Sequence, residues 1–275
     1  MSPGAEEPKG VGAGEQRDRE ASLPHLCPSA HALRLGAALF NGDHGRLAEE
    51  VARLEAAGLD FVHLDVFDGY FVSDVGFSPR TIATLRPLTR LPFEVHLGVM
   101  EPLRFVPHLV DAGADLILVH VESLRMSYEA IAAIREQKVR VGLAVTLGTP
   151  VAALQPVISQ LDAVLLLSRV TGETTRGVGT AFNPLAIPRV RAVREMITAA
   201  NAQVDLQVAG GVNRHNAADL VAAGATTLAL GAGIYKVPDM AQEVAEVRDL
   251  VERVFLLEWR KYGSMAGSDR LEIVR

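Results

Sequence analysis

The feature that most limits the fold of this chain is an alternation of short apolar runs with longer amphipathic segments. Apolar residues in the intervening segments have helical spacing, as over 45–57, 103–112 and 126–137. Strands that are apolar on both faces are typical of a parallel sheet covered by helices. The pattern therefore predicts an α/β fold with eight strands. The candidate strands are Leu33–Phe40, Phe61–Phe67, Pro92–Val99, Leu116–Glu122, Val139–Thr146, Ala163–Val170, Asp205–Val212 and Thr227–Ile234.

Three junctions of the same kind, at 56–65, 111–120 and 222–231, lead from a helix through Ala-Gly into a strand. The glycine supplies the left-handed residue that ends a helix. Eight strand–helix units within residues 31–262 fit a single closed (β/α)8 barrel of the TIM type. The alternative is an open doubly wound sheet, which usually has a GxGxxG turn after its first strand. Here the first strand leads into Phe40-Asn41-Gly42-Asp43, which favours the barrel.

Composition limits the partners and the compartment. Residues 1–30 are rich in proline, glycine and charge, so we expect a flexible tail, and we expect 263–275 to be loosely ordered. The single cysteine, Cys27, cannot form an internal disulfide, which is consistent with a reducing cytoplasm. The net charge of −6 disfavours a nucleic-acid partner. No apolar run reaches the ~18 residues of a membrane span, so we expect no membrane partner.

Polar residues at a spacing of two mark the ends of three successive strands. The pairs are His63 with Asp65, Glu94 with His96, and His120 with Glu122. Residues i and i+2 of a strand point to the same face, and barrel enzymes have their active sites at the carboxyl ends of the strands. Two histidines and one carboxylate are a recognised set for a divalent metal ion. We therefore expect His63, Asp65 and His96 to bind a metal, with the other three residues around them.

Glycines follow the seventh and eighth candidate strands, where (β/α)8 barrels often bind phosphate. A glycine lets backbone N–H groups approach a ligand closely. The loop after the sixth strand (169–180) adds glycines, hydroxyl groups and two arginines. Three such loops on neighbouring strands predict a phosphate pocket. The candidate phosphate-binding residues are Gly177, Gly179, Gly210, Gly211, Gly231 and Ala232.

The sequence HLDVFDGYFVSDVGFSP (63–79) resembles the H-x-D-V-M-D-G-x-F-V-P-N stretch of the ribulose-phosphate 3-epimerase family. The segments EVHLGV (94–99), AGADLILVHVES (112–123) and AGGVNRHNAADLVAAGATTLALGAGI (209–234) follow the pattern of the same family. The similarity covers about residues 33–250.

The resemblance implies an activity. In the family, one aspartate removes the proton at C3 of a ketose phosphate, a divalent metal stabilises the enediolate, and a second aspartate returns a proton on the opposite face. By position, His63, Asp65 and His96 would bind the metal, which could be Zn, Fe, Mn or Co, and Asp65 would also be the catalytic acid/base. The substrate would be a phosphorylated sugar, and the chain would form a homo-oligomer.

The sequence departs from the family pattern at strand seven. The family has Asp-Gly-Gly there, and this chain has Ala209-Gly210-Gly211, which removes the fourth metal ligand and the second acid/base. Asp205 lies four residues earlier, roughly 13 Å along the strand at ~3.3 Å per residue. Pocket methionines of the family are replaced by Phe67, Gly98 and Leu167.

Three functional hypotheses follow. The first is a metal-dependent sugar-phosphate epimerase or isomerase whose second proton comes from Glu122, His120, Arg169 or water. The second is a one-base isomerase or lyase, because an enediolate also serves aldose–ketose exchange and carbon–carbon cleavage. The third is a non-catalytic barrel that binds a sugar phosphate or a protein, which the alanine at 209 favours.

Overall fold

The computed structural model describes residues 33–170 and 181–263, with the side chains of the last helix as far as Leu257. The predicted tail at 1–30, with Cys27, lies outside the described residues, and so does the predicted C-terminal tail beyond Gly263. Within the described residues, none of the helices is both long and apolar enough to cross a membrane.

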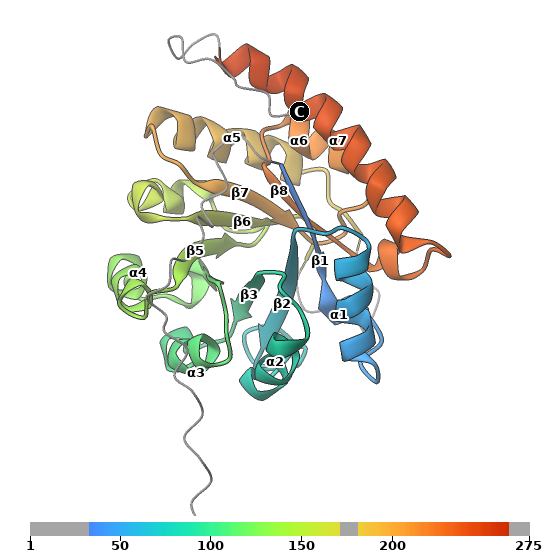
Figure 1. Cartoon of the computed structure of the whole chain (residues 1–275). Helices are drawn as coiled ribbons and strands as arrows, with labels where there is room; N and C mark the ends of the chain where they lie inside the picture. Colours follow the sequence, from blue (N-terminus) through green and yellow to red (C-terminus); the bar gives the residue numbers. More distant parts are fainter. Residues whose placement is uncertain (1–32, 171–180, 264–275) are drawn as a thin grey trace, which may run out of the picture.

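Eight strands of the described chain form one closed barrel in which every neighbouring pair is parallel. They follow one another around the barrel in sequence order, and the last strand pairs with the first (Figure 1). This confirms the predicted (β/α)8 barrel. The strands are β1 (Arg34–Ala38), β2 (Phe61–Phe67), β3 (Phe93–Gly98), β4 (Leu116–His120), β5 (Arg140–Val145), β6 (Ala163–Leu167), β7 (Asp205–Ala209) and β8 (Thr227–Leu230).

Helices lie around the outside of the barrel (Figure 1), and the long last helix packs against its predecessor. The glycines of the three Ala-Gly junctions have positive φ, as predicted for residues that end helices: 77° at Gly58, 94° at Gly113 and 110° at Gly224. The helices are α1 (Leu47–Ala56), α2 (Pro79–Leu85), α3 (Val106–Asp111), α4 (Ser127–Glu136), α5 (Ala186–Ala199), α6 (Ala217–Ala222) and α7 (Met240–Gly263).

The connection between β5 and β6 departs from the strand–helix alternation that the sequence predicts. It contains two 3-10 helices, η5 (Val151–Leu154) and η6 (Ile158–Gln160), where the other connections of the described chain contain an α-helix. Pro156 separates the two, and a proline inside a helix lacks the amide hydrogen and clashes with the preceding turn. The segment is therefore divided into short turns.

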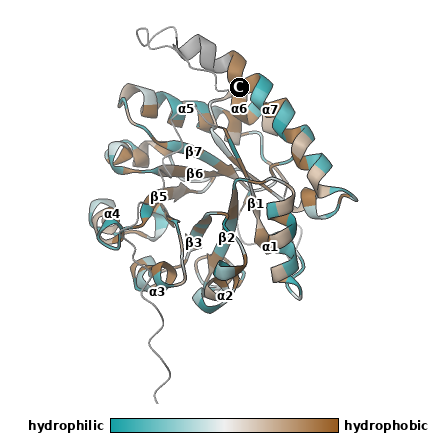
Figure 2. Ribbon diagram, in the orientation of Figure 1, coloured by the Kyte–Doolittle hydropathy of each residue, from teal (hydrophilic) through white to brown (hydrophobic). Residues whose placement is uncertain are grey.

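Two groups of buried apolar side chains stabilise the barrel. The larger group packs between the strands and the helices, and includes the fully buried Leu35, Leu64 and Leu97. In Figure 2 the strands are coloured largely as hydrophobic, whereas α1 and α7 carry both kinds of residue. The smaller group lies on the inward faces of the strands. Its members are Phe61, Leu116, Leu118, Ala144, Ala163, Leu165, Leu167, Ala209 and Ala229.

Phe61 depends on the glycine opposite it on β1. A Cβ added at Gly36 would lie 2.4 Å from two atoms of the Phe61 ring, so the ring occupies the space of the missing side chain. The guanidinium of Arg34 lies 4.8 Å from the centre of the same ring. These contacts fill the barrel below the level of the candidate site.

Candidate metal centre and active site

The three predicted metal-binding residues meet at the carboxyl ends of β2 and β3. Asp65 and His96 are partners in the register of the two strands, which places their side chains at the same level. Asp65 Oδ1 lies 2.9 Å from Nδ1 of His96 and 3.4 Å from Nε2 of His63. One nitrogen or oxygen atom from each residue lies within 4.8 Å of the others, and all three residues are buried. The structure therefore brings together the set that the sequence pattern singled out.

The charges in this cluster suit a cation. Burial by itself would raise the pKa of Asp65, but the charges and hydrogen bonds of His63 and His96 outweigh it and hold that pKa well below its ordinary range. Burial lowers the pKa of His96 to about 4, although the hydrogen bond to Asp65 acts in the opposite direction. At neutral pH the carboxyl group is thus ionised and the His96 imidazole is neutral. Those are the protonation states in which the two side chains can bind a metal.

A hydrogen-bonded series continues from His96 to the next strands. His96 Nε2 lies 2.7 Å from Nε2 of His120, at the end of β4, and His120 Nδ1 lies 3.0 Å from Oε2 of Glu122. Glu122 belongs to the short helix η4 (Val121–Ser123). Its other oxygen, Oε1, accepts hydrogen bonds from the backbone N–H and hydroxyl of Thr146 and from the hydroxyl of Thr149. Both predicted outer residues, His120 and Glu122, thus connect to the metal-binding set through His96.

These contacts leave Glu122 ionised. Burial by itself would raise its pKa, but the bonds from His120, Thr149 and the Thr146 N–H lower it to about 2. The two threonines are functional candidates that the sequence pattern did not single out. Their hydroxyl groups directly after β5 were the available signal.

The candidate phosphate-binding glycines that lie within the described residues are neighbours at the ends of β7 and β8. A Cβ added at Gly231 would lie 3.7 Å from Cα of Gly211, so the two loops are in contact. The Gly231 N–H donates to Val212 O at 3.0 Å, so it is not free for a ligand. Ala232 begins the short helix η7 (Ala232–Tyr235). Gly177 and Gly179 lie outside the described residues.

Comparison with known proteins decides the family. The model of the ribulose-phosphate 3-epimerase family matches residues 34–235. A ribulose-phosphate 3-epimerase of Bacillus subtilis is 32% identical over 217 residues, which cover 78% of this chain and 98% of that protein. The chain belongs to the ribulose-phosphate 3-epimerase family. The predicted resemblance is thereby confirmed.

Two further comparisons bear on the family and on the fold, respectively. The ribulose-phosphate 3-epimerase 2 of Cupriavidus necator is 35% identical over 215 residues, or 77% of this chain and 88% of that protein. Among solved structures, a 3-hexulose-6-phosphate synthase from Salmonella typhimurium superposes with a TM-score of 0.58 and 17% identity. That superposition covers 82% of this chain and all of the other, and at this identity it supports the barrel fold alone.

Ala209 occupies the place on β7 where the family pattern has an aspartate. Its side chain is buried among the inward apolar residues, together with Ala229 of β8. The methyl group offers neither a metal ligand nor a proton. Asp205 does not replace the missing carboxylate, because it begins β7 at the opposite end of the barrel and pairs there with Arg140 at 2.9 Å and Arg34 at 3.5 Å.

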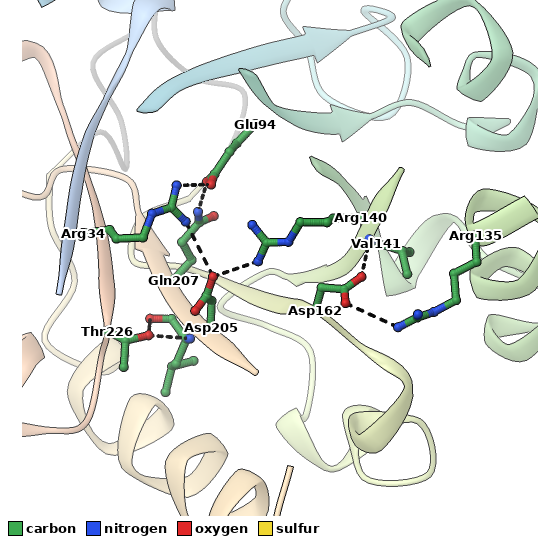
Figure 3. Close-up of polar contacts among 10 residues, drawn as sticks. Arg34, Glu94, Arg135, Arg140, Val141, Asp162, Asp205, Gln207 and Thr226 are labelled. Atoms are coloured by element: carbon green, nitrogen blue, oxygen red, sulfur yellow. Dashed lines mark hydrogen bonds and ion pairs between the residues drawn. The ribbon is translucent and has the colours of Figure 1, made fainter. Parts of the chain in front are cut away.

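Glu94, which the sequence pattern grouped with the metal-binding residues, lies below them in the same barrel. Its carboxylate contacts Arg34 at 2.6 Å and accepts a hydrogen bond from Gln207 (Figure 3). The three side chains form a buried polar cluster with Asp205 near the amino-terminal ends of the strands. Residues at that end of a (β/α)8 barrel usually contribute to stability, whereas the active site lies at the other end.

Aromatic residues cover the histidines in this member of the family. The Phe67 ring meets the His96 ring edge to face, with centroids 5.4 Å apart, and the Phe71 ring lies 4.8 Å from that of His120. A Cβ added at Gly98 would lie 2.8 Å from Cδ1 of Phe67. The two departures from the family's methionines are therefore spatially coupled, because the ring of Phe67 occupies the space that a side chain at Gly98 would need.

Asp68 is a further residue that the sequence pattern did not single out. Its Oδ1 accepts hydrogen bonds from the backbone N–H groups of Tyr70 and Phe71, and its Oδ2 accepts one from Met100, each at 2.8 Å. The carboxylate thus joins the loop after β2 to the loop after β3. The Asp-Gly pair at this point, typical of a turn, was the signal in the sequence.

Proposed function

We propose that the chain is a metal-dependent epimerase or isomerase of a phosphorylated ketose, and that its reaction resembles that of ribulose-5-phosphate 3-epimerase through an enediolate. The observation that supports this most strongly is the buried set of Asp65 between His63 and His96 at the mouth of the barrel. Membership of the family supplies the class of reaction.

The donor set fits a divalent cation. Two imidazoles and one ionised carboxylate converge on one another from two adjacent strands, and His63, Asp65 and His96 would hold the ion. When bound, the cation would stabilise the negative charge that develops on the substrate oxygens. Zn, Fe, Mn and Co are all compatible with nitrogen and oxygen ligands of this kind.

Asp65 is the proposed base. Its Oδ1 is the atom that contacts both histidines, while Oδ2 makes no hydrogen bond to another described residue. Oδ2 is therefore the atom that we assign to removal of the proton at C3. Because the pKa of Asp65 lies below its ordinary range, the carboxylate is ionised and can accept a proton at neutral pH.

The return of a proton on the opposite face needs a different donor from that of the family pattern, because position 209 is alanine. Glu122 is a poor candidate, since it is ionised and all its contacts are with donors. Water from the mouth of the barrel is then the simplest source. The same alanine supports the alternative that the chain is a one-base sugar-phosphate isomerase or lyase, and a non-catalytic sugar-phosphate-binding barrel is the third outcome to be tested.

Other parts of the proposal concern the substrate and the assembly. The loops after β7 and β8, with Gly210, Gly211 and Ala232, are the proposed phosphate site. A homo-oligomer and a cytoplasmic location remain predictions, which light scattering and fractionation of cells would test.

The deciding experiment is proton NMR of ribulose 5-phosphate in D₂O with metal-loaded protein. We expect loss of the C3 proton signal and appearance of xylulose 5-phosphate, and we expect Asp65→Asn to abolish both. Exchange without xylulose 5-phosphate would favour the one-base isomerase or lyase. No exchange, with folded and metal-bound protein, would refute action on this substrate and favour a binding role.

A further inference from the structure

We infer that Glu122 and His120 are positioning residues that fix which nitrogen of His96 carries the proton, and so leave Nδ1 of His96 free to bind the metal. The inference rests on the metal site of the proposed function and goes beyond it by assigning a role to two residues that do not bind the metal. Its basis is the hydrogen-bonded series from Asp65 to Glu122.

When a cation is bound by Asp65 and His96, the Glu122 end of the series has only one proton arrangement. An ionised carboxylate accepts hydrogen bonds and cannot donate them, so His120 must carry its proton on Nδ1, the atom that faces Glu122. With its proton on Nδ1, His120 presents the lone pair of Nε2 as an acceptor. Because Nε2 of His96 lies 2.7 Å away, it must be the donor of that contact. In the metal-bound protein His96 therefore donates from Nε2, and its Nδ1 carries no proton.

The metal end requires the same arrangement. Nδ1 of His96 is the nitrogen that faces Asp65, at 2.9 Å from Oδ1. Without a cation, a proton on Nδ1 would serve this contact, and a cation bound by Asp65 and His96 takes the place of that proton. An imidazole nitrogen binds a metal only through its lone pair, so the second nitrogen, Nε2, must be the protonated one. The metal at one end and Glu122 at the other thus require the same arrangement, with protons on Nε2 of His96 and on Nδ1 of His120.

His63 shows that this support is specific to one ligand. Its Nε2 faces Asp65, whereas its buried Nδ1 has no hydrogen-bond partner among the described residues. In protein metal sites the second ring nitrogen of a ligating histidine usually donates to a carboxylate, a carbonyl or water. Here, within the described residues, the series provides that second contact for His96 alone. His120 supplies it directly, and Glu122 supplies it through His120.

Glu122→Gln tests the direction of the series with little change of shape. The backbone N–H of Thr146 can only donate, and it meets Oε1 of Glu122 at 2.9 Å. In the variant this N–H donates to the amide oxygen of the glutamine, so the amide NH₂ group faces Nδ1 of His120. His120 must then accept at Nδ1 and donate from Nε2, which moves the proton of His96 to Nδ1. The variant therefore occupies the metal-binding lone pair with a proton.

We would measure zinc affinity by competition with a chromophoric chelator, for the wild type, Glu122→Gln and the control Glu101→Gln. Glu101 follows β3, is exposed and pairs with Arg104, so its variant removes the same charge without touching the series. Residues that hold a metal ligand in place typically contribute 10- to 100-fold to metal affinity. We expect a loss of about that size for Glu122→Gln and less than about 3-fold for Glu101→Gln.

A second measurement does not depend on any variant. Long-range proton–nitrogen NMR of zinc-loaded wild type should find the proton on Nε2 of His96 and on Nδ1 of His120. The opposite tautomer of either histidine would overturn the inference, and so would wild-type affinity in folded Glu122→Gln. Absence of zinc binding by the wild type would overturn the metal site of the proposed function as well. Failure of the inference alone, with zinc bound by the wild type, would leave the proposed function standing.

Discussion

Gly98→Ala is expected to destabilise the protein through the ring of Phe67. The added Cβ would lie 2.8 Å from Cδ1 and 2.9 Å from Cε1 of that ring, closer than the ~3.5–4.0 Å optimum between carbon atoms. The ring has little room to move, because it packs against His96 on one side and lies 6.1 Å from the Phe40 ring on another. Overpacking of this kind costs about 1–3 kcal/mol.

An opposing effect must be subtracted. Replacing glycine by alanine restricts the unfolded chain and stabilises a protein by about 0.4–1 kcal/mol where the backbone tolerates it. The φ angle of Gly98 is not in the positive region, so this gain applies. The net loss should then be about 0.5–2 kcal/mol, or a fall in Tm of roughly 2–4 °C for each kcal/mol in a chain of this size.

Urea denaturation of four proteins would test the reasoning: wild type, Gly98→Ala, Phe67→Met and the double variant. In the Phe67→Met background the slimmer side chain leaves space for the methyl group, so Gly98→Ala should be neutral or stabilising. The coupling free energy between the two positions should reach about 1–3 kcal/mol, as expected for residues in contact. An equal effect of Gly98→Ala in both backgrounds would show that the ring does not limit this position.

Arg34→Met should reduce the free energy of unfolding by about 3–5 kcal/mol in urea denaturation, because it leaves the buried Glu94 without its cation. The control Arg104→Met, at an exposed ion pair, should leave the denaturation curve unchanged. The folded pKa of Glu122, about 2, lies below its ordinary 4.5, so the stability it contributes is complete above about pH 4.5 and is lost as pH falls toward 2. Between these pH values the free energy of unfolding should fall less for Glu122→Gln than for the wild type. An equal pH dependence of the two proteins would contradict the assignment. Ala209→Asp should lower the stability of the metal-free protein by about 1–3 kcal/mol, because it buries a carboxyl group among apolar side chains. Added zinc should then raise the Tm of this variant more than that of the wild type, since the cation binds the folded state.

The barrel followed from the sequence because an apolar run occurs in each of the eight units and an Ala-Gly junction recurs at three of them. The ends of the elements were less accurate. Candidate strand Leu33–Phe40 is β1 only over Arg34–Ala38, because the apolar run continues into the 3-10 helix η1 (Leu39–Asn41). The helix expected over 103–112 begins at Val106, after a 3-10 turn that starts at Pro102. Hydrophobicity alone does not distinguish a strand from the turn that follows it.

The spacing of polar residues predicted which side chains form the candidate site, but it did not predict the position of each side chain along the barrel axis. Glu94 and His96 share a face, yet two residues of a strand span about 6.6 Å, and Glu94 therefore meets Arg34 below the site. Heights depend on the stagger between strands, which residue spacing on one strand does not contain. Glu122 lies past the end of β4, so strand alternation does not describe it, and it reaches His120 from a 3-10 turn.

The buried cluster of Arg34, Glu94 and Gln207, with the ring of Phe61 in the space at Gly36, closes the barrel at its lower end. Among the described residues the lower end is thus filled, so ligands and solvent are expected to reach the metal-binding residues from the carboxyl ends of the strands. If the chain interconverts two sugar phosphates, substrate and product must use the same entrance in turn, and each excludes the other while it is bound. Product should accordingly inhibit competitively against substrate. The water that would deliver the second proton must enter by the same route.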